Sequence, residues 1–363
     1  MEKYSSAMIK ELQMQMQWVC GMPQTSGEDS RIMYDFNNDT NSIVKRTSLL
    51  HGVKESSTAQ QESTICNPET GEFILFYNGE DIIDGYLNKV NPTPILAQDH
   101  TFLTSLIAPD PTSKTRFNIF YSEQNSYSLN YAIVDFNDGF SMPATWIGHK
   151  QLQTLSSTVP LGIACKNEQT YWLLALENSH TIRAYEFSPT SKGTTIKHIA
   201  LQPFAQLNKD VDCTTSSIVT FKNKIAITVN NQIMVGELDF SKGLAITNQY
   251  FVDKDTVTLM PAFNKDATKL FYLKPHNNQN QDHVFVYEDG ASYSPSSYKF
   301  QEKYVCLKLG PNGRIYGTNA FVTIDPLLVI EEIADEVEIN EIVKDPINSS
   351  TTFGNCQYQI NNF

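Results

Sequence analysis

The chain has 363 residues, of which 40% are hydrophobic and 18% charged, and its formal net charge is −13. The hydrophobic share is sufficient for a packed core, which excludes global disorder. The chain has 40 acidic and 27 basic residues, so it lacks the excess of positive charge that is typical of a nucleic-acid-binding protein. No apolar run approaches the ~18 residues of a membrane-spanning helix.

The N-terminal residues 1–16 are expected to form an extension ahead of the first strand. Met8, Ile9 and Leu12 stand with Met16 at helical spacing, which favours a short helix that caps the fold or inserts into a neighbouring protein. The segment lacks a basic region followed by an apolar stretch and a cleavage site, so it differs from a secretory signal peptide. This predicts synthesis in the cytoplasm without a signal peptide.

A unit of two apolar strands joined by a tight turn recurs along the chain. A third strand that ends in an acidic residue follows each pair, and the period is about 45–55 residues, typical of propeller blades. The second strands begin near Phe73, Phe117, Tyr171, Ile225, Leu270 and Ile315. The third strands are expected in residues 82–86, 131–136, 182–187, 234–240, 284–289 and 321–325. A seventh copy at residues 31–36 has residues 17–23 as its partner strand.

These units predict an all-β fold in which residues 1–363 form a single domain. Each unit would be a small antiparallel sheet that is marginal alone, and radial packing buries its apolar faces. The number of units predicts one seven-bladed β-propeller, with six or eight blades as alternatives. The strand-like residues 353–360 have no partner in their own unit, so we expect them to pair with the first blade and close the ring.

Several short motifs follow one another in a fixed order, at residues 18–21, 34–36, 66–79, 117–121, 131–135, 171–177, 182–185 and 354–357. In this order they resemble the β-propeller at the N-terminus of Bacteroidetes gliding-motility-associated and type IX-secreted surface proteins. The resemblance implies a propeller fold and an exported, adhesin-like protein. Members of that family are exported and usually continue into further domains. A chain without a signal peptide that stops at Phe363 suits instead a phage virion or a contractile-injection apparatus.

Nothing in the sequence points to catalysis, a metal or a cofactor. The nucleophile-elbow, metalloprotease, phosphate-loop and dinucleotide motifs do not occur, so we predict no catalytic residues and no enzyme activity. The alternating oxygen side chains of residues 35–41 lack the glycine and the glutamate of a calcium loop. Acids that end strands are expected to accept hydrogen bonds in the following turns. The six cysteines are Cys20, Cys66, Cys165, Cys213, Cys306 and Cys356, and their spacing is not that of a metal site. Cys66, Cys165 and Cys306 stand in matching strands and are expected to be reduced and buried.

Residues 330–347 depart from the repeat and are interpreted as an acidic insertion before the closing strand. Their pattern fits a solvated loop or helix on the ring, with partial strand alternation from Val337 onward. The alternative is a docking element whose negative field attracts a basic partner. Candidate partner-binding residues are Glu331, Glu332, Asp335 and Glu336, together with Met8, Ile9 and Leu12.

The sequence as a whole favours a non-enzymatic scaffold that binds other proteins of a multi-component assembly. A phage virion, in its tail or head-associated part, or a contractile-injection apparatus is the expected location. Two alternatives stay open: an exported cell-surface adhesin, and a glycan-binding or hydrolytic propeller that uses carboxylates at its channel mouth.

Overall fold

The structure is a computed structural model. It describes residues 17–20, 32–35, 44–46, 63–95, 105–123, 126–137, 139–155, 159–167, 169–178, 181–201, 216–254, 256, 258, 260–275, 282–295, 306–318, 326–333 and 336–343. In these ranges the regular structure is all strand, arranged in seven antiparallel sheets of consecutive strands. No helix of this described part is long and apolar enough to cross a membrane.

The first two sheets have three described strands each and the other five have four. Sheet one contains β1 (Gln17–Cys20), β2 (Ile32–Asp35) and β3 (Val44–Arg46), and sheet two contains β4 (Ser63–Cys66), β5 (Phe73–Tyr77) and β6 (Ile82–Asp84). Sheet three contains β7 (Ser105–Pro109), β8 (Arg116–Ser122), β9 (Ser128–Asp135) and β10 (Thr145–Thr154). Sheet four contains β11 (Leu161–Asn167), β12 (Thr170–Asn178), β13 (Thr181–Thr190) and β14 (Gly193–Leu201).

The remaining three sheets repeat this four-stranded plan. Sheet five contains β15 (Ser217–Phe221), β16 (Lys224–Val229), β17 (Gln232–Asp239) and β18 (Ala245–Asp253). Sheet six contains β19 (Ala262–Phe263), β20 (Lys269–Pro275), β21 (Asp282–Glu288) and β22 (Ala291–Tyr293). Sheet seven contains β23 (Cys306–Leu309), β24 (Ile315–Thr318), β25 (Pro326–Ile333) and β26 (Glu336–Val343).

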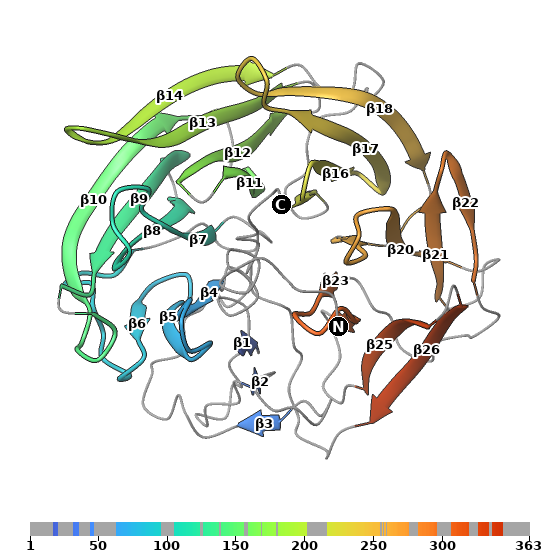
Figure 1. Cartoon of the computed structure of the whole chain (residues 1–363), viewed down its shortest axis with the longest axis horizontal. Helices are drawn as coiled ribbons and strands as arrows, with labels where there is room; N and C mark the ends of the chain where they lie inside the picture. Colours follow the sequence, from blue (N-terminus) through green and yellow to red (C-terminus); the bar gives the residue numbers. More distant parts are fainter. Residues whose placement is uncertain are drawn as a thin grey trace.

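The sheets are arranged radially, with their first strands toward the centre and their last strands at the rim (Figure 1). First strands of neighbouring sheets contact each other at β1 and β4, β4 and β7, β7 and β11, β11 and β15, and β19 and β23. A parallel bridge between Met260 and Cys306 indicates that the chain runs in the same direction at the start of sheets six and seven. This arrangement is that of a β-propeller.

The predicted hairpins and third strands are confirmed where the structure describes them. Each of the six predicted strand pairs forms the first two strands of a sheet, as β4 and β5 do. The predicted third strands correspond to β6, β9, β13, β17 and β21. The sequence did not predict the fourth strands, because they lie at the rim and are mostly exposed: β10 has no buried residue. The extension 1–16 and the closing strand 353–360 lie outside the described residues.

The interpretation of residues 330–347 as an insertion requires correction. Residues 326–333 and 336–343 form β25 and β26, which pair in register from Pro326↔Val343 to Ile333↔Glu336 as the third and fourth strands of sheet seven. The third strand was expected at residues 321–325, which lie outside the described part of the chain. Alternation explains the strand: Val337 and Ile339 pack against the core, whereas Glu338 between them is exposed.

Buried aromatic rings fill the contact between sheets three and four. The Phe120 ring on β8 lies 5.1 Å from Phe187 of β13 and 6.3 Å from Tyr171 of β12, both in edge-to-face geometry. Tyr171 and Phe187 stack at 5.2 Å. The Tyr171 hydroxyl also accepts a hydrogen bond of 3.1 Å from Asn118 Nδ2 on β8. Apolar contact and a buried hydrogen bond therefore join these two sheets.

Polar links also join neighbouring sheets around the described part of the ring. Between sheets five and six, Asp253 accepts bonds from the Tyr272 hydroxyl at 3.0 Å and from Lys274 Nζ at 3.0 Å. Sheets two and three are joined by Ala144 N, which donates to Asp84 Oδ2 at 3.1 Å. These links fix the sheets relative to one another, so the ring can hold side chains on different sheets in a constant geometry.

The prediction of buried thiols is confirmed for three cysteines. Cys66, Cys165 and Cys306 stand in the first strands of sheets two, four and seven and are buried. Burial raises the pKa of the Cys306 thiol to about 12. Since the thiolate is the reactive form, this shift lowers the reactivity of the Cys306 thiol at neutral pH.

In a sheet of four consecutive antiparallel strands, the turn between the first and second strands and the turn between the third and fourth strands lie at the same end. The turns that join first to second and third to fourth strands therefore gather on one face of the ring, which we call the hairpin face. In sheet six these turns contain Asp266 and Asp289, and in sheet seven the first of them is followed by Arg314.

Candidate interaction surface

Two of the predicted partner-binding acids take part in the fold. On β25, a Glu331 carboxylate oxygen lies 3.0 Å from Nη2 of Arg314, in the same sheet. Glu332 reaches across to sheet six, where it lies 2.9 Å from Lys269 Nζ and accepts a bond of 3.0 Å from Asn264 Nδ2. These two carboxylates are already paired, so the structure assigns them a role in joining strands and sheets.

The structure does not describe the side chains of the other predicted residues. Glu336 begins β26, but its side chain is outside the described part, and Asp335 lies between the two described strands. Met8, Ile9 and Leu12 fall in the N-terminal segment, also outside it.

Changing Glu331 and Glu332 together to glutamine is expected to lower the free energy of unfolding by about 1–2 kcal/mol, because two partly shielded ion pairs are lost. Urea denaturation would measure this change. Glu338→Gln is the matched control: Glu338 stands opposite Glu331 on β26 and is exposed, so its replacement should stay within about 0.5 kcal/mol of wild type. Equal midpoints for the double variant and the control would show that these ion pairs do not stabilise the ring.

A groove lies between sheets five and six on the hairpin face. Its volume is about 600 Å³, in the range typical of ligand pockets. Sheet five contributes residues of β16, β17 and β18. Sheet six contributes the turns before β20 and β22, together with residues of β19, β20 and β21. The lining residues that matter below are Lys224, Glu237, Asn248, Tyr250, Asp266, Lys269, Tyr287 and Asp289.

Both lysines of the groove have acidic partners. Lys224 Nζ lies 2.5 Å from Glu237 Oε1, and the other oxygen of Glu237 accepts a bond from Asn248 Nδ2. The hydrogen bond from Lys224 and, to a smaller extent, the one from Asn248 lower the pKa of Glu237. Lys269 is paired with Glu332, and this hydrogen bond raises the pKa of the lysine. Both lysine charges of the groove are therefore paired with carboxylates of the fold.

The carboxylates of the two turns are in a different situation. Within the described residues, neither Asp266 nor Asp289 has a side-chain hydrogen bond or an ion-pair partner, and both are exposed. Beside them, Tyr250 is 55% exposed, which is high for a large aromatic side chain. Burial raises the pKa of Tyr287, whose ring lines the same groove. The groove thus presents uncompensated negative charge next to aromatic surface.

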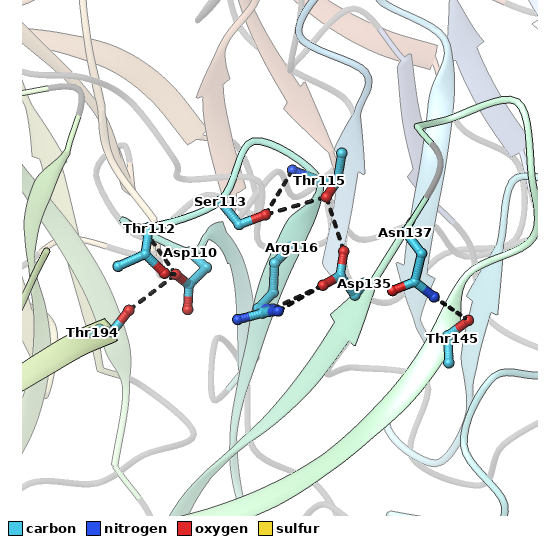
Figure 2. A network of polar contacts seen from close by, with 9 residues as sticks. All are labelled: Asp110, Thr112, Ser113, Thr115, Arg116, Asp135, Asn137, Thr145 and Thr194. Atoms are coloured by element: carbon cyan, nitrogen blue, oxygen red, sulfur yellow. Dashed lines mark hydrogen bonds and ion pairs between the residues drawn. The ribbon is translucent and has the colours of Figure 1, made fainter. Parts of the chain in front are cut away.

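Two acids elsewhere on the hairpin face, Asp110 and Asp135, are bonded within the fold (Figure 2). Asp135 receives bonds from Arg116 at 2.8 Å and from the Thr115 hydroxyl at 2.9 Å. Asp110 receives a bond of 3.0 Å from the Thr194 hydroxyl on the neighbouring sheet. The predicted turn role is confirmed for Asp239, which accepts a bond from Ser241 N, whereas Asp135 pairs across strands instead.

The groove was not predicted from the sequence. Asp266 belongs to a turn that the repeat located, but Asp289 and Tyr250 carry no signal that would separate them from other turn and rim residues. Tyr250 in addition lies on β18, one of the fourth strands that the pattern missed. Across the described ranges, no three His, Cys, Asp or Glu side chains meet in a way that could hold a metal ion.

Comparisons with known proteins support the fold. No family model and no curated protein matches the sequence. Among solved structures, a putative 6-phosphogluconolactonase from Bacteroides uniformis aligns with a TM-score of 0.60 and 12% identity, covering 93% of this chain and 100% of that one. A protein from Lactobacillus plantarum aligns with a TM-score of 0.57 and 11% identity, covering 94% and 99%.

A looser alignment, with a TM-score of 0.49 and 9% identity, is to the WD40 domain of SCAP from fission yeast, and covers 94% of this chain and 96% of that domain. At such identities the likeness shows a shared fold and does not extend to activity. The chain is thus an all-β protein that shares its fold with the first two of these structures, and its radial order of sheets is that of a β-propeller.

Proposed function

We propose that this chain is a non-enzymatic, seven-bladed β-propeller that serves as a protein-interaction scaffold in a larger assembly, such as a phage virion or a contractile-injection apparatus. The observation that carries the proposal is the groove on the hairpin face, where carboxylates and an exposed tyrosine are left outside the bonding of the fold. A rigid ring that presents such groups on turns is suited to hold a partner. In this proposal residues 353–360 close the ring on sheet one.

The composition of the native particle tests this function. A tagged chain expressed in its own host should co-purify, after density-gradient separation, with a defined set of other proteins identified by mass spectrometry. Tyr250→Ala should reduce its incorporation severalfold, because aromatic residues contribute strongly to protein interfaces. Tyr127→Ala is the matched control, since Tyr127 is also exposed, at 41%, and lies outside the groove.

Recovery of the wild-type chain only as a free monomer would contradict the scaffold proposal. Recovery in the outer-membrane fraction would instead favour the exported adhesin. Turnover in a hydrolase panel would favour the enzymatic alternative.

A further inference from the structure

We propose that the groove between sheets five and six binds an extended segment of a partner protein through an arginine side chain. This inference rests on the proposed function and names the chemistry of the partner. It is drawn from the charges, the aromatic surface and the position of the groove.

The charge balance of the groove calls for a cation from outside. Lys224 is matched by Glu237, and Lys269 lies 2.9 Å from Glu332 and 3.9 Å from Glu288. Asp266 and Asp289 then remain as two carboxylates with no partner among the described residues. A bound cation would pair with them without competing for the lysines, and the net charge of −13 would attract a basic partner to the ring.

The aromatic lining favours arginine over other cations. Tyr250 from sheet five and Tyr287 from sheet six both line the groove, and a guanidinium group stacks on such rings by cation–π attraction. Its planar fork can donate two hydrogen bonds to one carboxylate, which the compact ammonium of lysine cannot. The apolar stem of arginine can pack on the aromatic wall of the groove, where Tyr250 is 55% exposed.

The dimensions and the charge favour a peptide segment over a sugar. A volume of about 600 Å³ accommodates more than one side chain, so residues that flank the arginine can enter as well. A neutral oligosaccharide could stack on the tyrosines but would leave both aspartates uncompensated. A protein segment with one basic and several apolar side chains satisfies both parts of the surface.

Peptide binding to the full chain tests the inference. The probe is a fluorescein-labelled peptide, Ser-Gly-Leu-Arg-Leu-Gly-Ser, and its matched control has Gln in place of Arg. By fluorescence polarisation we expect the arginine peptide to bind at least ~10-fold more tightly than the glutamine peptide, and more weakly as salt is raised. The double variant D266N/D289N should lose this preference, and Tyr250→Ala should weaken binding of both peptides.

Controls separate lost binding from lost folding. Asp266 and Asp289 are exposed turn residues, so D266N/D289N should melt within about 0.5 kcal/mol of wild type, and E338Q on sheet seven should keep full binding. Equal affinity for the two peptides, or full arginine preference in D266N/D289N, would overturn the inference. So would binding of maltohexaose, a neutral oligosaccharide, that Tyr250→Ala abolishes and D266N/D289N leaves unchanged.

The two proposals fail in distinguishable ways. If the peptides bind without preference while Tyr250→Ala still reduces incorporation into the native particle, the scaffold function stands and the arginine assignment is wrong. If the chain associates with no other protein in its host, the scaffold function fails regardless of the peptide result.

Discussion

Replacing Phe120 with alanine is expected to destabilise the folded chain by about 3–5 kcal/mol, the range for a fully buried phenylalanine. The ring is completely buried on β8, and its contacts with Tyr171 and Phe187 cross to sheet four. Its removal leaves a cavity at the junction of two sheets, whose strands cannot collapse into it without shifting the hydrogen-bonded ladders. Urea denaturation followed by tryptophan fluorescence would measure the loss.

The control for this variant is Tyr127→Ala, which removes an aromatic side chain that is 41% exposed in the turn before β9. Its unfolding free energy should stay within about 0.5 kcal/mol of wild type, because no cavity is created. A Phe120→Ala variant that unfolds at the same denaturant concentration as Tyr127→Ala would mean that the aromatic contact between sheets three and four does not hold the ring together.

Deleting residues 353–363 is expected to produce a chain that aggregates or elutes as a mixture of species. In the proposed closure these residues pair with sheet one, which has only three described strands. Without them a strand edge would be exposed and the ring would no longer be fastened at its ends. Size-exclusion chromatography with light scattering, together with thermal melting, would detect the change.

The matched control is deletion of residues 361–363, which leaves the predicted closing strand 353–360 intact. This shorter deletion should give a monodisperse chain with a wild-type melting temperature. Identical behaviour of the two deletions would rule out closure by this strand and would require sheet one to be stabilised by another segment.

The strands that face the core were predictable from the sequence, because burial leaves a pattern. In β12, for example, the residues Tyr171 to Leu176 are continuously apolar and all buried, and the preceding turn is polar. The outermost strands leave no such pattern. β10, with the sequence TWIGHKQLQT, is exposed or half-buried at every position, so its residues resemble a polar loop.

Exposure at the sheet edge also explains why the sequence pattern predicted an insertion, and not strands, at residues 330–347. An edge strand is commonly protected from pairing with other molecules by charged side chains, and β26 carries three glutamates in its eight residues. Charge that protects a sheet edge and charge that recruits a partner look alike in one sequence. Only the contacts between packed sheets distinguish the two roles. Glu332 on β25, for example, pairs with Lys269 only after sheets six and seven are packed together.

The groove could not be predicted for a related reason. Asp266 and Tyr250 belong to different sheets, and nothing in their local sequences indicates that they line one surface. Their proximity results from the radial order of the sheets. The chemistry of the surface therefore depends on tertiary packing, whereas the turns that supply Asp266 and Asp289 are local.

Because every sheet is built from consecutive strands, the chain can acquire its structure in the order in which it is synthesised. The contacts within a sheet join residues that are near in sequence, and each new sheet needs only its predecessor as a packing partner. Sheets two to seven could thus accumulate one after another during translation. In the proposed closure, the pairing of residues 353–360 with sheet one would be the last event, because it joins segments that lie farthest apart in the sequence.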